Sequence, residues 1–247
     1  MHVDILYEDN HMLAVNKPPG APVQMDASED PCLIDAVKYD LIHRHNKPGN
    51  AYAVPVHRLD RPSSGVLLFA KTSKATSRLM TSFAGRKVRK IYWVIVEGIP
   101  QTKKGRLTGW LLKNKATNRS ELVPGDTPGA KNAALSYEVT AASKDRALLR
   151  IELETGRGHQ IRVQLADIGH PVAGDLRYGH RQGFGSMIAL HAGRLEVPHP
   201  TRDETIVIIA PPPARWRELF GDALVDAIGN TPEDVPEDAP DPSESRP

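Results

Sequence analysis

The 247-residue sequence predicts an α+β fold, in which a mixed, mainly antiparallel sheet core carries flanking helices. Segments with strand character outnumber helical segments and do not alternate with them regularly, whereas a doubly wound fold requires regular alternation. In residues 148–154 apolar and charged residues alternate, as expected of a strand with one buried side and one solvent-facing side. We see no internal repeat and no obvious linker, so we expect a single folded body over residues 1–229.

Apolar runs between turn residues locate the strands in order along the chain. They are expected at residues 3–7, 12–15, 54–56, 66–70, 91–97, 135–140, 148–154, 187–197 and 205–210. Apolar residues three and four apart indicate helices, the second of which begins with Thr72 or Ser73 as its cap. The helices are expected at residues 33–45, 73–85, 159–167 and 213–224. The buried stripe of the third helix is expected to consist of Ile161, Gln164, Leu165 and Ile168. Residues 102–132, with seven Lys and Arg residues, are expected to be irregular.

The net charge of +2 hides an uneven distribution of charge along the chain. Residues 231–247 contain six acids and one base, so this Pro-rich tail carries −5 and the rest of the chain carries +7. From residue 230 to residue 247 the composition predicts a disordered acidic tail. A basic body favours a nucleic-acid partner, because phosphate binding requires clustered Lys and Arg. Charge alone leaves open a second interpretation, in which the balance mainly serves solubility.

Several classes of protein are disfavoured by what the sequence lacks. No stretch approaches the roughly 20 apolar residues that cross a bilayer, and the N-terminus lacks the layout of a secretory signal. The single cysteine, Cys32, excludes an internal disulfide and a cysteine-rich zinc site, so a reducing compartment, the cytoplasm, is expected. His43 and His45 have the wrong spacing for one helical face, and no His-Glu-x-x-His motif occurs. We therefore expect no metal site.

Chemically, the most informative segment lies between two apolar strands and reads His57-Arg58-Leu59-Asp60-Arg61-Pro62-Ser63-Ser64-Gly65. A guanidinium near Asp60 would keep this carboxylate ionised where water is excluded. An ionised, desolvated carboxylate is what a nucleophile or a general base requires. The same local pattern fits a buried aspartate that pairs with an arginine to brace a turn. The local residues leave both interpretations open.

The wider pattern resembles the RluA family of pseudouridine synthases, whose signature loop is His-Arg-Leu-Asp, two variable residues, Thr or Ser, Ser and Gly. With Pro62 in the variable pair, the loop resembles that of the tRNA-modifying branch of the family named TruC. Further motifs of the family follow in the same order, and the resemblance spans about residues 3–215. They are Lys17-Pro18-Pro19-Gly20, Arg89-Lys90-Ile91-Tyr92-Trp93, Glu154-Thr155-Gly156-Arg157-Gly158-His159-Gln160-Ile161-Arg162-Val163, Gly169-His170-Pro171, Gly174-Asp175, Tyr178-Gly179, Leu190-His191-Ala192 and His199-Pro200.

This resemblance implies an enzyme, acting as a monomer, that isomerises a specific uridine to pseudouridine in structured RNA, either tRNA or rRNA. It implies neither a metal nor an organic cofactor. By its position in the motifs, Asp60 matches the catalytic aspartate, Tyr92 the active-site tyrosine and Arg162 the arginine that pairs with the aspartate. Arg58 matches a residue that helps to displace the target nucleotide. Since a stacked base is inaccessible, the nucleotide must be flipped into a pocket, where Tyr92 would stack on the uracil.

Four basic residues shortly before Tyr92 are candidates for RNA contacts, and they are Arg86, Lys87, Arg89 and Lys90. They would grip phosphates beside the flipped base. A solvated helix end, which basic residues favour through the helix dipole, fits them equally well. Two other functions also remain open at this point. One is a catalytically idle RNA-binding protein on the same scaffold, and the other is a carboxylate-nucleophile hydrolase of small molecules, which leaves the basic body unexplained.

The chain departs from the family pattern at two positions around the third motif. Gly158 stands where Thr is usual, and Gln164 stands where His is usual. The N-terminus begins directly in the catalytic domain, so we expect no S4 domain, the RNA-binding module that some relatives carry. Recognition of the RNA would then depend on the catalytic domain itself or on a partner.

Overall fold

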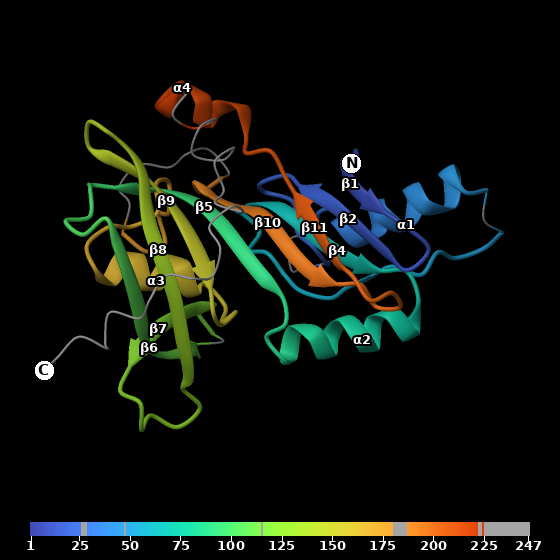
Figure 1. The fold of residues 1–247 in the computed structure, drawn as a ribbon, viewed down its shortest axis with the longest axis horizontal. Coiled ribbons are helices and arrows are strands. Elements are labelled where there is room, and N and C mark those ends of the chain that lie inside the picture. The colour runs from blue at the N-terminus through green and yellow to red at the C-terminus, as the bar shows by residue number, and fades with distance from the viewer. Residues whose placement is uncertain (26–28, 47, 115, 180–186, 222–223, 225–247) are drawn as a thin grey trace, which may run out of the picture.

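The computed structural model describes residues 1–25, 29–46, 48–114, 116–179, 187–221 and 224. The strands in the described part of the chain form one sheet of eleven strands (Figure 1). They are β1 (Ile5–Glu8), β2 (Met12–Lys17), β3 (Val54–Pro55), β4 (Ser64–Ala70), β5 (Arg89–Glu97), β6 (Lys104–Asn114), β7 (Arg119–Val123), β8 (Lys131–Ser143), β9 (Arg146–Leu153), β10 (Leu190–Pro198) and β11 (Thr205–Ile209). The helices are α1 (Leu33–Arg44), α2 (Ser73–Ala84), α3 (Gln160–Asp167) and α4 (Arg217–Phe220), the last preceded by a 3-10 turn at Ala214–Trp216.

The sheet runs in the order β1-β2-β4-β10-β5-β9-β8-β6-β7, with β3 added to β4 and β11 added to β10. Among the pairings described, β4 and β10 run parallel and the other pairs run antiparallel. The predicted α+β fold with a mainly antiparallel sheet is therefore confirmed. The long strands β5 and β10 lie in the middle and connect the half that carries α1 and α2 with the half that carries α3 (Figure 1).

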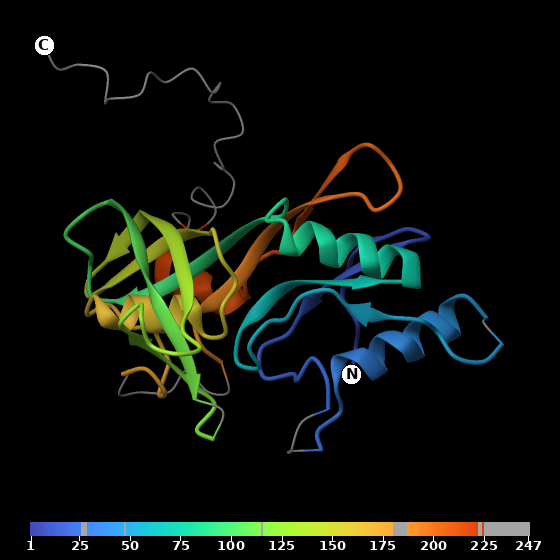
Figure 2. The ribbon, with the colours of Figure 1, turned by 90° about the horizontal axis from the view of Figure 1, so that it is seen from below.

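Strands β2 and β4 are covered on both sides, because α1 and α2 lie on opposite faces of this half of the sheet (Figure 2). Leu13 of β2 packs in the same buried cluster as Val37 of α1. Its neighbour Ala14 points the other way and packs in the cluster of Leu79 from α2. Every residue of β4 is buried, which explains its continuous apolar sequence. Each fully buried large aliphatic side chain contributes about 1.5–3 kcal/mol to this core.

Of the two predicted caps of α2, Thr72 and Ser73, the structure has Thr72, whose side-chain oxygen accepts a hydrogen bond of 3.1 Å from the amide of Ala75. This satisfies one of the amide hydrogens that a helix N-terminus leaves without an intrahelical acceptor. The cap thereby fixes where the chain leaves β4 and enters the helix.

The prediction of an irregular segment over residues 102–132 was wrong, because this part of the chain forms β6, β7 and the start of β8. Most of β6 is partly exposed and carries basic residues, so apolar alternation gives little signal there. Two glycines weaken the strand pattern further. At Gly105 a Cβ atom would lie 2.6 Å from the ring of Tyr137 on the neighbouring strand β8, so the aromatic ring occupies the space that a side chain would need.

Two details at the helices also differ from the sequence prediction. Ile161, Gln164 and Leu165 are buried in α3 as expected, but Ile168 lies just beyond the helix end and is 36% exposed. The last predicted helix is shorter within the described residues, where α4 ends at Phe220. Residues 225–247, which include the predicted acidic tail, lie outside the described part of the chain. None of the helices described is long and apolar enough to cross a membrane.

Candidate active site

Asp60 lies in the loop between β3 and β4, and the buried side chain of Lys17 supports this loop from the interior. The Nζ atom of Lys17 donates to the carbonyl oxygens of Pro18 at 2.9 Å, Arg61 at 3.0 Å and Ser63 at 2.8 Å. Ser63 in turn donates from its hydroxyl to the Asp60 carbonyl at 2.7 Å. The backbone on the C-terminal side of Asp60 is thus held by two side chains.

Burial lowers the pKa of the Lys17 ammonium to about 7, while the negative charge of Asp60 acts in the opposite direction. A buried charge or amine is tolerated only where hydrogen-bond partners surround it. The three carbonyl oxygens supply these partners. Lys17 therefore exchanges its hydration shell for contacts that hold the loop in one conformation.

Gly65 closes the loop and is required by a close backbone contact. Its φ angle is +111°, and a Cβ atom at this position would lie 2.2 Å from the carbonyl oxygen of Ala192. Because no side chain fits there, glycine permits the parallel pairing of β4 with β10, in which Gly65 opposes Ala192. This pairing anchors the Asp60 loop at the centre of the sheet.

Arg162 of α3 contacts the Asp60 carboxylate, as the motifs imply. Its Nη1 atom donates to Asp60 Oδ2 at 3.0 Å, across 102 residues of sequence. The rest of the guanidinium donates to Asp175, from Nε to Oδ2 at 2.6 Å and from Nη2 to Oδ1 at 2.8 Å. Arg162 is 4% exposed and Asp175 is 1% exposed. A bidentate pair of this kind fixes the plane of the guanidinium and so the direction of its third hydrogen bond.

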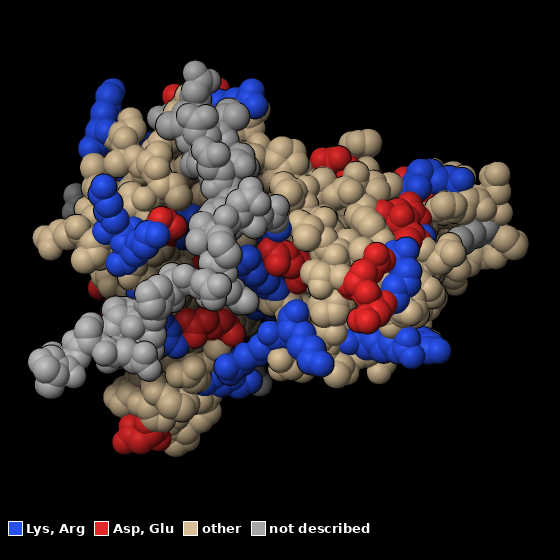
Figure 3. Space-filling view, viewed as in Figure 1, with Lys and Arg blue, Asp and Glu red and all other residues tan. Residues whose placement is uncertain are grey.

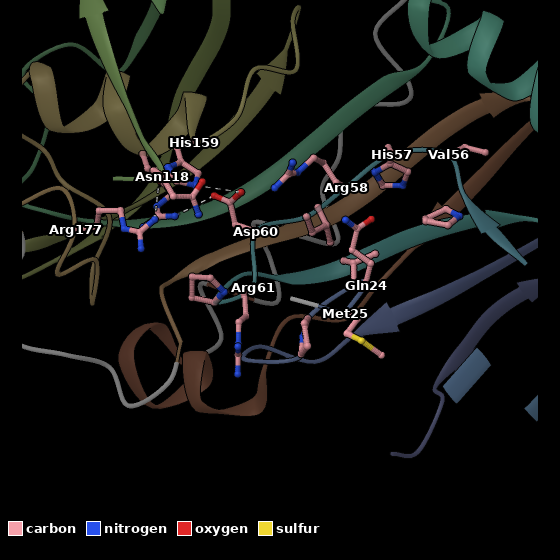
Figure 4. Close-up of a pocket in the computed structure, with 16 residues that line it drawn as sticks. Gln24, Met25, Val56, His57, Arg58, Asp60, Arg61, Asn118, His159 and Arg177 are labelled. Carbon is pink, nitrogen blue, oxygen red and sulfur yellow. Dashed lines mark hydrogen bonds and ion pairs between the residues drawn. The ribbon is translucent and has the colours of Figure 1, made fainter. Parts of the chain in front are cut away.

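Arg61 directly follows Asp60 in sequence, but its side chain takes another direction. Arg61 points away from Asp60 (Figure 4) and pairs with Asp30. Burial alone would lower the pKa of Arg162, but the hydrogen bonds and charges of Asp175 and Asp60 outweigh it and raise that pKa. The cation beside Asp60 is therefore permanent, and it comes from the far half of the fold.

Tyr92 lies on β5 and is 8% exposed. Burial, reinforced by the negative charge of Asp60, raises the pKa of its phenol, so the hydroxyl stays protonated at neutral pH. A cavity of about 90 Å³ is lined by Tyr92, Asp60 and Arg162 together with backbone of the loop before α3. The three residues that the motifs single out thus meet in one small chamber.

Two larger cavities, of about 680 Å³ and 850 Å³, open on either side of this chamber. Asp60, His159 and Arg162 line the first, and Tyr92 lines the second. Arg58 lines both of them and the small chamber as well. In Figure 4 it stands between Asp60 and His57. This position lets the Arg58 side chain enter the path of any group that passes into the chamber.

The second large cavity is basic. Lys and Arg side chains gather on this face beside the end of α2, with acidic side chains among them (Figure 3). The predicted RNA-contact residues Arg86, Lys87, Arg89 and Lys90 all line the cavity, together with Arg157. Arg89 differs from the others because it is already paired with Glu152, at 2.8 Å and 3.0 Å, and with Glu196 at 3.3 Å.

Sequence reasoning assigned no role to Lys17, His159 or Asp175, although each contributes to the surroundings of Asp60. All three stand inside motifs that the sequence displays, but a motif does not reveal which of its charged residues are buried. Asp175 is separated from Arg162 by 13 residues, and only the turn after α3 brings the two together. Among the residues described, no group of three His, Cys, Asp or Glu side chains is arranged to hold a metal ion.

Comparison with known proteins points in one direction. A family model described as RNA pseudouridylate synthase matches residues 11–167. A Bacillus subtilis protein named uncharacterized RNA pseudouridine synthase YhcT is 37% identical over 88% of this chain and 71% of its own length. The tRNA pseudouridine synthase C of Vibrio vulnificus is 31% identical over 88% of this chain and 94% of its own. The solved structure of human RNA pseudouridylate synthase domain containing 4 shares the fold, with a TM-score of 0.74, 21% identity and coverage of 92% and 93%.

Proposed function

Since the chain belongs to the RNA pseudouridylate synthase family, and is thus an RNA pseudouridine synthase of the type its motifs resemble, we propose that Asp60 is its catalytic carboxylate. The observation that carries this proposal is the 3.0 Å bond from Arg162 to Asp60 Oδ2, at the wall of a chamber of about 90 Å³ that Tyr92 also lines. A carboxylate that faces a small cavity suits reaction with one flipped nucleotide.

The reaction is an isomerisation that needs no external reagent. The bond between ribose C1′ and uracil N1 breaks, the base turns, and a bond forms between C1′ and C5. The proton on C5 leaves and N1 gains a proton, so atoms and charge balance without water or a redox partner. Asp60 is proposed to act on the sugar or the base, and Arg162 to orient its carboxylate. Tyr92 is proposed to offer its ring as a stacking surface for the uracil, worth about 1–3 kcal/mol per base.

We propose that Arg58 helps to displace the target nucleotide from its stack, because its side chain lines the chamber and both larger cavities. Arg86, Lys87 and Lys90 are proposed to contact phosphates of the flanking strand, since they line the basic cavity next to the chamber. Arg89 is proposed to act there through its ion pairs, which orient Glu152 at the edge of the same cavity.

The proposed substrate is a structured RNA, either tRNA or rRNA. Relatives named for both substrates match the chain to a similar degree, with 33% identity to the ribosomal large subunit pseudouridine synthase D of Zymomonas mobilis and 31% to the tRNA enzyme of Vibrio vulnificus. Mapping pseudouridines across total RNA, with and without the gene, tests the proposal. We expect one or a few sites in tRNA or rRNA to lose the modification, and an unchanged map would contradict it.

We further propose that the enzyme acts as a monomer in the cytoplasm, with residues 1–229 as its catalytic domain. Support for a monomer comes from the site itself, because Lys17, Asp60, Tyr92 and Arg162 all belong to one chain. Sedimentation of the full-length protein tests this point, and a stable dimer at low micromolar concentration would contradict it.

A further inference from the structure

We propose that His159 is a positioning residue for Asp60. Its neutral ring directs an Nε2 hydrogen towards Asp60 Oδ1, and a chain of hydrogen bonds from Ser120 through Tyr178 selects the tautomer that does so. The inference deepens the role proposed above for Asp60 and rests on it. It assigns His159 as the group that faces Oδ1, whereas Arg162 donates to the other oxygen of the carboxylate, Oδ2.

His159 lies at the start of α3, where it caps the helix in the left-handed conformation with φ of 59°. It is 6% exposed, and its Nε2 atom lies 3.8 Å from Asp60 Oδ1. In Figure 4 the Asp60 carboxylate points towards His159. Arg162 meanwhile binds the other oxygen, Oδ2. The two oxygens of the carboxylate thus face two different groups on the same helix terminus.

The tautomer follows from the partners of Tyr178. The amide of Ser120 donates to the Tyr178 hydroxyl oxygen at 2.8 Å. A backbone N–H group can only donate, so the phenol oxygen of Tyr178 is the acceptor in this hydrogen bond. The hydrogen of the phenol then remains available for a second hydrogen bond. Its other partner is His159 Nδ1, also at 2.8 Å. With Nδ1 accepting this hydrogen, a neutral imidazole must carry its proton on Nε2, which is the atom that faces Asp60.

Burial, more than the surrounding charges, keeps the His159 ring neutral. Burial lowers the pKa of His159 to about 4, and the cations Arg162, Arg177 and Lys113 act in the same direction, while Asp60 opposes them. Tyr178 faces the ring as well, and burial raises the pKa of its phenol, so the hydroxyl keeps the hydrogen that it donates. Above about pH 5 the network therefore has one arrangement of protons.

A distance of 3.8 Å is longer than a hydrogen bond, so His159 acts on Asp60 in the free enzyme as an aligned dipole. Catalytic hydrogen bonds are often long in the free enzyme and shorten when substrate binds. A nucleotide that enters the chamber displaces water and strengthens the attraction between the ring N–H and Oδ1. His159 then fixes the plane of the Asp60 carboxylate, while Arg162 places a positive charge beside it.

The network also connects the site to the β6–β7 hairpin. Ser120 is the second residue of β7, and its hydroxyl donates to the carbonyl oxygen of Gly158 at 2.7 Å. Ser120 therefore fixes both the backbone before His159 and the phenol beyond it. Arg119 lies next to it and places its guanidinium 5.3 Å from the centre of the Tyr178 ring. The basic hairpin and the Asp60 carboxylate are thus connected through two side chains, those of Tyr178 and His159.

The decisive variants are Tyr178→Phe, which removes one hydroxyl and keeps the ring, and His159→Asn, which suits the left-handed backbone. We expect Tyr178→Phe to slow single-turnover pseudouridine formation about tenfold and His159→Asn on the order of 100-fold, each with unchanged RNA affinity. Because Tyr178 acts through His159, the double variant should be no slower than His159→Asn. Tyr137→Phe is the matched control, since it removes a buried hydroxyl that contacts Thr102 instead.

Multiplied effects in the double variant, or a Tyr178→Phe rate equal to that of the control, would overturn the inference. Ring nitrogen NMR of the full-length protein gives an independent answer. We expect the His159 proton on Nε2 in the unmodified protein and a mixture of tautomers in Tyr178→Phe, and a proton on Nδ1 would also overturn it. Asp60→Asn serves as the reference in the same assay. Full activity in that variant would remove the proposed function and this inference together, whereas the other adverse results remove the inference alone.

Discussion

Arg162 donates a single hydrogen bond of 3.0 Å to Asp60, although the two residues come from opposite halves of the fold. Two further donors of the guanidinium, at Nε and Nη2, bind Asp175, so the direction of the bond to Asp60 is set before any substrate arrives. Preorganised charge of this kind costs no rearrangement during the reaction. The position of the Asp60 carboxylate thus depends on Asp175 as well as on Arg162.

Asp175→Asn is expected to lower both stability and activity. The change leaves Arg162 as a buried cation with one full counter-charge fewer, and breaking a buried ion pair costs about 3–5 kcal/mol. We expect the free energy of unfolding in urea to fall by about 3 kcal/mol and kcat to fall more than KM rises. A variant with unchanged stability would show that Asp175 does not hold Arg162.

Lys17→Met is expected to affect catalysis more than folding alone explains. It leaves the carbonyl oxygens of Pro18, Arg61 and Ser63 without the Nζ donor, which loosens the loop around Asp60. A misplacement of about 1 Å costs on the order of 100-fold in rate. Lys71→Met is the control, since Lys71 is nearly buried and binds Glu8 and the carbonyl of Asp9. Measured below both melting temperatures, only Lys17→Met should lose kcat; equal losses would contradict the assignment.

Replacing Lys87 should weaken RNA binding in a salt-dependent manner. A lysine that neutralises one phosphate adds about 0.7–0.9 to the slope of log affinity against log salt concentration. We expect Lys87→Gln, in the basic cavity, to reduce that slope by roughly this amount. Lys74→Gln, an exposed residue of α2 outside the cavity, should leave it unchanged. Equal slopes for both variants in a titration from low to high KCl would place the RNA elsewhere.

Stability should fall as the pH drops below about 6.5. Burial lowers the pKa of His57 to about 3 and those of His159 and His191 to about 4, from an ordinary value near 6.5. Between these values the unfolded chain binds protons that the folded chain excludes, so unfolding becomes easier as the pH falls, by on the order of 1 kcal/mol per pH unit for each histidine. Above about pH 6.5 these histidines do not make the free energy of unfolding depend on pH.

Urea unfolding at pH 7.0, 6.0 and 5.0 measures this effect. Carboxylates such as Asp9, whose pKa lies at about 2, do not contribute in this range. His191 is fully buried, and its ring nitrogens bind Ser64 and the carbonyl of Ala210. His191→Gln should show a shallower decline than the unmodified protein. Parallel profiles for the two proteins would exclude His191 as a source of the pH dependence.

The sequence predicted the elements that follow simple rules and missed those that depend on distant contacts. The cap at Thr72 and the apolar strand β4 are local features, and both are confirmed. The alternation in residues 148–154 marks β9 correctly. By contrast, β6 was missed because Tyr137 of another strand fills the space over Gly105, which no window of β6 itself reveals.

The same division applies to the candidate site. Motif resemblance placed Asp60, Tyr92 and Arg162 together, and they line one chamber. The position of Arg162 on its own helix does not disclose its burial, and only the tertiary fold makes it 4% exposed. The role of Lys17 depends on carbonyl oxygens 44 and 46 residues away, which composition and spacing do not disclose.

Single-turnover pseudouridine formation by Asp60→Asn, measured together with RNA binding, is the most direct test of the catalytic role of Asp60. Asparagine keeps the size of the side chain and an acceptor for Arg162, but it removes the negative charge that the reaction requires. We predict RNA affinity close to that of the unmodified enzyme and no detectable product. Pseudouridine formed at the unmodified rate would contradict the assignment of Asp60 as the catalytic carboxylate.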